Sequence, residues 1–285
     1  MKYPSLSPGI GYMILAAFFF SIMAAFVKAS GSHLPFMEIV FARSVIVFLI
    51  TFIWLRKHRI PVLGNRKGLL FLRGLVGFFG LTAFYYTLTH IPIADSVMLQ
   101  YSSPLFTALL ATVVLKEKSS ARLWGLYLLA FLGVAFIVRP GFSVQAGPAL
   151  VGVLGAFSAG LAYNLVRYLR NWEHPMTIVL SLPLVSILLS FPFVLRNFVM
   201  PTGWDWVFLL GVGVATQIAQ VFLTKGLVAE KAAVATNVIY VNVVFSALWG
   251  VLFWGEVPSA LSIAGGMLVV VAIVLINHYR QDAAA

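Results

Sequence analysis

The residues best suited to bind a solute are uncharged polar and aromatic side chains that interrupt long apolar segments. In one such segment, Ala94–Leu115, they are Gln100, Tyr101 and Ser103. Tyrosine joins an apolar ring to a hydroxyl, and glutamine or asparagine offers both a donor and an acceptor. Such groups suit a zwitterion or an amide. The other candidates of this kind are Phe20, Ser21, Tyr85, Tyr86, Tyr163, Asn164, Gln217, Gln220, Asn237, Tyr240 and Asn242.

The same side chains have a structural interpretation. Polar groups on membrane helices also bond to neighbouring helices, for about 0.6 kcal/mol on average. For any single residue the two interpretations stay open. For Tyr101 and Tyr240, which occupy equivalent positions in the repeat described below, the pattern favours a cavity lining. Pro104 lies beside Tyr101 and can free backbone groups next to a cavity.

Charged residues are rare inside the apolar segments. Arg43 is a candidate for binding a carboxylate, but it could also pair with Glu38 one turn away or cap backbone carbonyls. Glu117 and Glu256 end two segments, where we expect them to lock helices together and not to carry protons. Asp95 begins a helix, where a carboxylate suits the dipole. Because no acid lies at mid-depth, the sequence argues against proton-coupled drug export.

The sequence lacks the residues that several kinds of chemistry require. The chain has no cysteine, no GxxxxGK[ST] loop and no dinucleotide fingerprint. Its five histidines lie at segment ends or in loops, without metal-ligand spacing, and no Ser/His/Asp arrangement lies inside a segment. The sequence therefore predicts a protein that is not an enzyme and uses no cofactor and no metal.

The composition of the chain indicates a protein that folds in a lipid bilayer. Of 285 residues 61% are hydrophobic and 9% are charged, with a mean hydropathy of +1.01. Soluble domains carry about 25% charged residues. We therefore expect an all-α integral membrane protein with ten spans of about 20 residues. These are Gly9–Val27, Phe36–Leu55, Leu69–Thr89, Ala94–Leu115, Leu123–Val138, Pro148–Val166, Met176–Leu195, Trp204–Thr224, Ala232–Trp254 and Ser259–Asn277.

Basic residues orient these spans. With the N-terminus inside, 15 of the 19 Lys and Arg residues fall on the cytoplasmic side, 3 fall outside, and Arg43 lies within a span. This bias predicts that both termini are cytoplasmic. The net charge of +11 then needs no nucleic-acid partner. The expected partners are the lipid bilayer and a small-molecule substrate.

The two halves of the chain repeat. A shift of 139 residues places Tyr101 on Tyr240 and Glu117 on Glu256. The predicted domains are therefore 1–139 and 140–285, with five spans each. Five is odd, so the second copy crosses the membrane in the opposite direction. Secondary transporters use such inverted repeats for alternating access to a site near the midplane.

Two stretches carry a family resemblance. TLTHIPIADSVMLQYSSPLFTALLATVVLKE is similar to the ALSLxxLPxADA…PLFxxLLAxLxLxE pattern of the drug/metabolite transporter superfamily, and GLVAEKAAVATNVIYVNVVFSALWGVLFWGE resembles its degenerate second copy. The resemblance covers the chain as two EamA-type repeats. It implies a ten-helix basket around a central cavity and export or exchange of small metabolites across a bacterial inner membrane, as in YddG-type amino-acid exporters.

These observations favour a secondary transporter that works as a monomer. The expected substrates are amino acids, including aromatic ones. An exchanger of a nucleoside-like metabolite such as S-adenosylmethionine is one alternative. A non-transporting membrane scaffold or a channel is another.

Overall fold

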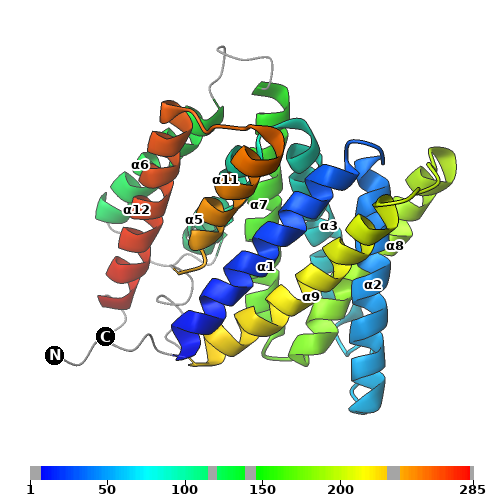
Figure 1. Ribbon diagram of the computed structural model, residues 1–285. Helices are drawn as coiled ribbons and strands as arrows, with labels where there is room; N and C mark the ends of the chain where they lie inside the picture. The colour runs from blue at the N-terminus through cyan, green and yellow to red at the C-terminus, as the bar shows by residue number, and fades with distance from the viewer. Residues whose placement is uncertain (1–7, 115–120, 139–145, 230–237, 283–285) are drawn as a thin grey trace.

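The computed structural model describes residues 8–114, 121–138, 146–229 and 238–282. These residues form helices joined by short connections and contain no β-strand (Figure 1). The helices are α1 (Pro8–Ser30), α2 (Phe36–Lys57), α3 (Lys67–His90), α4 (Ile93–Gln100), α5 (Ser103–Val114), α6 (Ala121–Val138), α7 (Ala146–Leu169), α8 (Pro175–Arg196), α9 (Asp205–Ala229), α11 (Val241–Trp254) and α12 (Ala260–Asp282).

Many of these helices have the length and hydropathy of membrane spans. Within the described ranges, six helices are long and apolar enough to cross a bilayer: α1, α2, α3, α7, α8 and α9. Shorter apolar stretches occupy α6, α11 and α12. The expectation of an all-α multi-pass membrane protein is confirmed at this level, whereas the count of ten spans stays a prediction.

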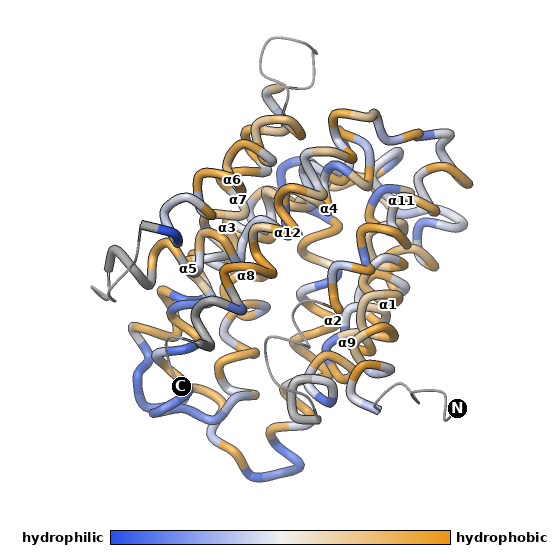
Figure 2. The backbone as a smooth tube through the Cα atoms, turned by 90° about the vertical axis from the view of Figure 1, so that its left-hand side faces the viewer, coloured by the Kyte–Doolittle hydropathy of each residue, from blue (hydrophilic) through white to orange (hydrophobic). Residues whose placement is uncertain are grey.

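Large apolar side chains cover the outer surface of the helices. Leu154, Leu195 and Leu252 are each exposed by about two thirds of their area. Figure 2 shows hydrophobic residues along the helices and hydrophilic residues mainly at helix ends and connections. A water-soluble protein rarely exposes so much contiguous apolar area, but lipid solvates it well.

The contacts between helices repeat from one half of the chain to the other. Helix α1 packs along α9, and α7 packs along α3. A shift of about 139 residues takes α1 to α7 and α3 to α9, so each of these contacts is the counterpart of the other. Helix α2 packs on its own counterpart α8, and α6 on α12. Figure 1 shows α1 and α9 running antiparallel across the molecule, with α6 and α12 at one end.

Helices α1 and α7, which correspond under the shift, run in opposite directions. In Figure 1, α1 starts at the lower side of the molecule, while α7 starts at the upper side. The first three helices start at residues 8, 36 and 67, and α7, α8 and α9 start at 146, 175 and 205. The starts differ by 138 or 139 residues, which matches the shift found in the sequence.

The predicted span Ala94–Leu115 is broken in the structure, into α4 and α5. Proline at position 104 has no N–H, so the carbonyl of Gln100 loses its helical donor. The N–H of Leu105 bonds to the carbonyl of Ser102 at 3.0 Å, which leaves the carbonyl of Tyr101 free for another partner. Proline suits the first turn of the new helix. The break therefore puts irregular backbone beside Tyr101.

Glycines allow the closest helix contacts. A Cβ on Gly80 in α3 would lie 3.1 Å from the backbone nitrogen of Ala159 in α7. Gly133 in α6 and Gly265 in α12 face each other, and a Cβ on either would lie 2.6 Å from the carbonyl oxygen of the other. Small residues at such crossings let backbones approach without a side chain between them.

Candidate functional site

Tyr101, between α4 and α5, and Tyr240, just before α11, contact each other. Their ring centroids are 5.3 Å apart with the planes tilted by 54°, and the Tyr240 hydroxyl donates to the Tyr101 carbonyl over 3.3 Å. That carbonyl is the one freed by the break between α4 and α5. Tyr240 precedes α11 in a turn as well. The two residues related by the sequence shift are therefore in direct contact.

Tyr163 of α7 faces the same region. It interacts electrostatically with Tyr101 and with the Arg73 guanidinium of α3. At 3.6 residues per turn, Tyr163 lies on the face of α7 that carries the buried Gly152, Ala156 and Ala159, yet 50% of its surface is exposed. An inward-facing side chain can be exposed only if open space lies in front of it. We call Tyr101, Tyr163 and Tyr240 the tyrosine group.

Arg43 lies inside the protein without the partner that the sequence suggested. Its side chain is only 7% exposed, and its Nε and Nη1 atoms have no hydrogen-bond acceptor among the described residues. Glu38 makes no ion pair with it: Oε2 of Glu38 accepts the backbone N–H of Val199 at 3.1 Å, and Oε1 is buried without a partner. Arg43 instead interacts electrostatically with Tyr85 and Arg73.

Three predicted polar residues join helices. The Asn242 amide in α11 donates to the carbonyl of Ala17 in α1 over 2.6 Å. The Asn164 amide in α7 donates to the carbonyl of Thr107 in α5 over 3.1 Å, so a hydrogen bond also joins the counterpart pair of helices, through residues that do not correspond under the shift. Ser21 accepts the indole N–H of Trp249 at 3.0 Å. Hydrogen bonding between helices accounts for these side chains, except that Oδ1 of Asn164 is buried without a partner.

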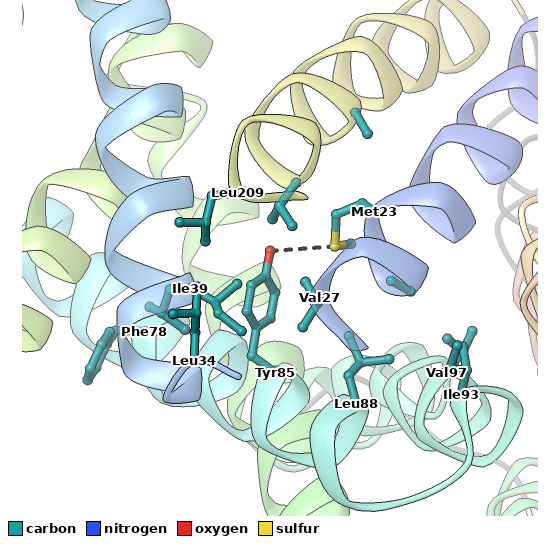
Figure 3. Close-up of a cluster of buried hydrophobic side chains, with 14 residues drawn as sticks. Met23, Val27, Leu34, Ile39, Phe78, Tyr85, Leu88, Ile93, Val97 and Leu209 are labelled. Carbon is teal, nitrogen blue, oxygen red and sulfur yellow. Dashed lines mark hydrogen bonds between the residues drawn. The ribbon is translucent and has the colours of Figure 1, made fainter. Parts of the chain in front are cut away.

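Tyr85 occupies a closed apolar cluster. Figure 3 shows its ring among Val27, Ile39 and other aliphatic side chains, with the hydroxyl directed at Met23. The hydroxyl donates to the sulfur of Met23 at 3.5 Å, and no part of the ring is exposed. Tyr85 is therefore enclosed by apolar side chains, and Arg43 acts on it electrostatically.

The remaining candidates are more scattered. Tyr86 stacks on His90 near the end of α3, with ring centroids 3.9 Å apart. The buried Ser103 begins α5, and the half-buried residues are Phe20, Gln100, Gln217 and Gln220. Asn237 and Glu117 lie outside the described residues, so the predictions for them stay open.

An open pocket lies between α5 and the last turns of α7. It has a volume of about 340 Å³ and is lined by Leu110, Leu161, Asn164, Arg167, Tyr168, Arg170 and Asn171. Asn164, with its unpartnered oxygen, links this pocket to the contact between α5 and α7. The basic residues at its rim give it a positive potential.

An ion pair ties three segments together at one end of the bundle. Nζ of Lys28, at the end of α1, lies 2.5 Å from Oε1 of Glu256, just after α11. Lys28 also donates to the carbonyl of Ile91 at 2.9 Å, and Oε2 of Glu256 accepts the N–H of Ile93 at 3.0 Å. The ion pair joins the first half of the chain to the second, and its hydrogen bonds also hold the turn before α4. The expected locking role of Glu256 fits these contacts.

Known proteins resemble the chain along its length. The model of the EamA-like transporter family matches residues 7–139 and 147–278. The pseudopaline exporter CntI of Pseudomonas aeruginosa is 36% identical over 278 residues, which cover 97% of this chain and 98% of the relative. Mouse solute carrier family 35 member G1 is 30% identical over 95% of this chain and 78% of its own length.

A solved crystal structure has the same fold. One of its chains superposes with a TM-score of 0.66 at 16% identity, over 98% of this chain and all of its own length. At that identity the likeness speaks for the fold alone. The two family matches coincide with the two halves found by the 139-residue shift. The chain therefore belongs to the EamA-like transporter family, within the drug/metabolite transporter superfamily.

Proposed function

We propose that the protein is a secondary carrier that exports a small amino-acid-like metabolite by alternating access. The observation that carries this proposal is the half-exposed Tyr163, which faces Tyr101 and Arg73 in the interior of a membrane protein. Lipid does not favour a polar group there, but a hydrated cavity does. A tyrosine wall with one buried guanidinium, that of Arg43, suits a molecule with an apolar part and a carboxylate.

The architecture supports the alternating-access part of the proposal. We take the ten predicted spans as two inverted five-helix repeats, because counterpart helices run in opposite directions and make counterpart contacts. Such halves can exchange conformations, which gives two states that open to opposite sides at similar energy. In this scheme the Lys28–Glu256 ion pair holds one side closed, and one copy of the chain suffices for transport.

The relatives bear on the substrate. The relative from Pseudomonas aeruginosa is named as an exporter of pseudopaline. This name supports export of a small metabolite by the present protein. The amino-acid part of the proposal rests on the tyrosine wall and Arg43.

Orientation can be tested directly because the chain has no cysteine of its own. We propose an inner-membrane protein with both termini in the cytoplasm, which puts His58 inside and Val199 outside. In intact cells an impermeant maleimide should then label Val199→Cys, and His58→Cys only after lysis. The opposite labelling would contradict the proposed topology and place both termini outside the cytoplasm.

The tyrosine group gives a prediction about transport. We expect Tyr101→Ala and Tyr240→Ala each to weaken substrate affinity about five- to tenfold, because each removes an aromatic wall. Tyr240→Phe keeps the ring and loses one hydrogen bond, so its effect should be smaller. The measurement is the KM for uptake by proteoliposomes with equal amounts of protein.

The control for this prediction is Tyr12→Ala, which removes a ring that stacks on Phe222 near the start of α1. It should leave the KM unchanged. If the alanine variants at 101 and 240 matched the wild type in KM, the tyrosine group would not line the transport path.

Uptake by proteoliposomes tests the proposal itself. A panel of amino acids, iminodicarboxylates and nucleosides, with and without a pH gradient, should include a solute that enters above the level of empty liposomes. Saturation distinguishes a carrier from a channel. If no solute in the panel enters, the carrier proposal fails, and the result favours the alternative of a non-transporting membrane scaffold.

A further inference from the structure

Arg73 differs from an ordinary arginine at the end of a membrane helix. It lies two turns into α3, and such side chains normally extend back to the polar interface. In a helix the Cα–Cβ bond already points to the N-terminus, so this route is open to Arg73. Its guanidinium lies beside Gly77 instead, with Nη1 3.2 Å from where a Cβ of Gly77 would be. The side chain therefore extends inward, away from the nearest interface.

The Arg73 guanidinium has no ion-pair partner in the part of the chain that the structure describes. Its Nε and Nη1 atoms are buried and lack an acceptor, and no carboxylate of the described residues comes within ion-pair distance. The groups that act on it electrostatically are the Tyr163 hydroxyl and Arg43. One of these is neutral and the other has the same charge.

Arg43 and Arg73 come from two helices, α2 and α3, and act on each other electrostatically. We call them the arginine pair. Arg43 is 93% buried and has the same two nitrogens without acceptors. Two like charges near each other in a low-dielectric interior repel, and each unpaired guanidinium loses hydration. No ion pair among the described residues compensates this arrangement. A bound anion would compensate both charges together, with Tyr163 as a further hydrogen-bond donor.

We propose that the transported molecule carries at least two anionic groups, one for each member of the arginine pair, and that Arg73 selects for the second. This inference rests on the proposed transport function and narrows its substrate to dicarboxylates built on an amino acid. Guanidinium groups suit carboxylates because planar N–H donors match both oxygens. A neutral zwitterionic amino acid has one carboxylate and would leave one arginine unpaired.

Matched ligands test this selectivity. Sarcosine and iminodiacetate share an N-substituted glycine skeleton, and L-glutamine and L-glutamate are nearly isosteric; within each pair the second member has one more carboxylate. In proteoliposomes, wild-type protein should take up the dicarboxylates about tenfold faster than their partners, as expected for one added charged hydrogen-bond pair. Arg73→Gln should abolish that ratio, and Arg73→Lys should keep part of it. Arg196→Gln, which removes an exposed arginine at the end of α8, should keep all of it.

Thermal unfolding separates binding from a structural role. Without ligand, Arg73→Gln should be at least as stable as the wild type, because it removes a buried unpaired charge; a structural arginine would lose stability. Iminodiacetate should raise the unfolding temperature of the wild type and not that of Arg73→Gln. Gly77→Leu keeps the charge but fills the space beside the guanidinium, and it should lose the same ligand-induced shift.

The outcomes distinguish the two proposals. If sarcosine or glutamine moves as fast as its dicarboxylate partner, the carrier stands and the arginine pair does not select dianions. The same holds if Arg73→Gln retains the wild-type ratio or unfolds at a lower temperature. If none of the four molecules moves while another solute in the panel does, the dicarboxylate inference is wrong. If no solute moves at all, the transport function itself is contradicted.

Discussion

Glu256→Gln is expected to destabilise the protein by about 2–4 kcal/mol, because it leaves Lys28 without its anion. The side chains of Lys28 and Glu256 are only 11% and 20% exposed, so water replaces the lost partner poorly. Glutamine can still accept the N–H of Ile93, and the loss is therefore mainly that of the charge. Thermal unfolding of the purified protein in detergent measures the effect.

Charge exchange is the control for this variant. Lys28→Glu alone places two acids together and should be more harmful than Glu256→Gln. The double variant Lys28→Glu with Glu256→Lys restores opposite charges and should recover part of the stability. A Glu256→Gln protein that unfolds at the wild-type temperature would show that the ion pair contributes nothing to holding α1, α11 and the turn before α4 together.

Gly160→Val is the second change with a large expected effect. A Cβ at this position of α7 would lie 2.8 Å from Cβ of Phe106 and 2.9 Å from the backbone nitrogen of Thr107, both in α5. Backbone cannot yield as a side-chain tip can, so α5 must move away from α7. Overpacking of this kind costs about 1–3 kcal/mol, and it also displaces the break next to Tyr101.

Gly147→Val provides the matched comparison on the same helix. A Cβ there has nothing within 4 Å, so the added side chain meets open space. We expect near-normal unfolding and uptake for Gly147→Val, and a lower unfolding temperature with slower uptake for Gly160→Val. Equal behaviour of the two variants would mean that close contact between α5 and α7 is not required.

The fold could be largely predicted because lipid imposes a simple rule on sequence. A spanning helix needs about 20 apolar residues, so hydropathy located α1, α2, α3, α7, α8 and α9 to within a few residues. The 139-residue shift located two halves, each of which contains one match of the family model. Hydropathy could not show the break at Tyr101, because a helix interrupted by one turn remains equally apolar; Pro104 was its only signal.

The site was less predictable because the hydropathy of a segment does not determine the direction in which each side chain points. Arg73 was counted among the cytoplasmic charges, since a base near a helix end normally reaches the interface; its position five residues into a predicted span was the signal to use. Glu38 was a plausible partner for Arg43 along one helix, but its Oε2 accepts the backbone N–H of Val199, far away in sequence. Tyr85 and Tyr163 both lie within predicted spans, yet one is enclosed and the other half exposed.

Counterflow is the most direct test of a carrier with alternating access. Proteoliposomes are preloaded with a high concentration of unlabelled solute from the uptake panel, diluted into buffer with a trace of labelled solute, and sampled over time. A carrier should accumulate label transiently above its equilibrium level, with saturation as the outside concentration rises. A monotonic approach to equilibrium without overshoot would indicate a channel, and label no higher than in empty liposomes would contradict transport altogether.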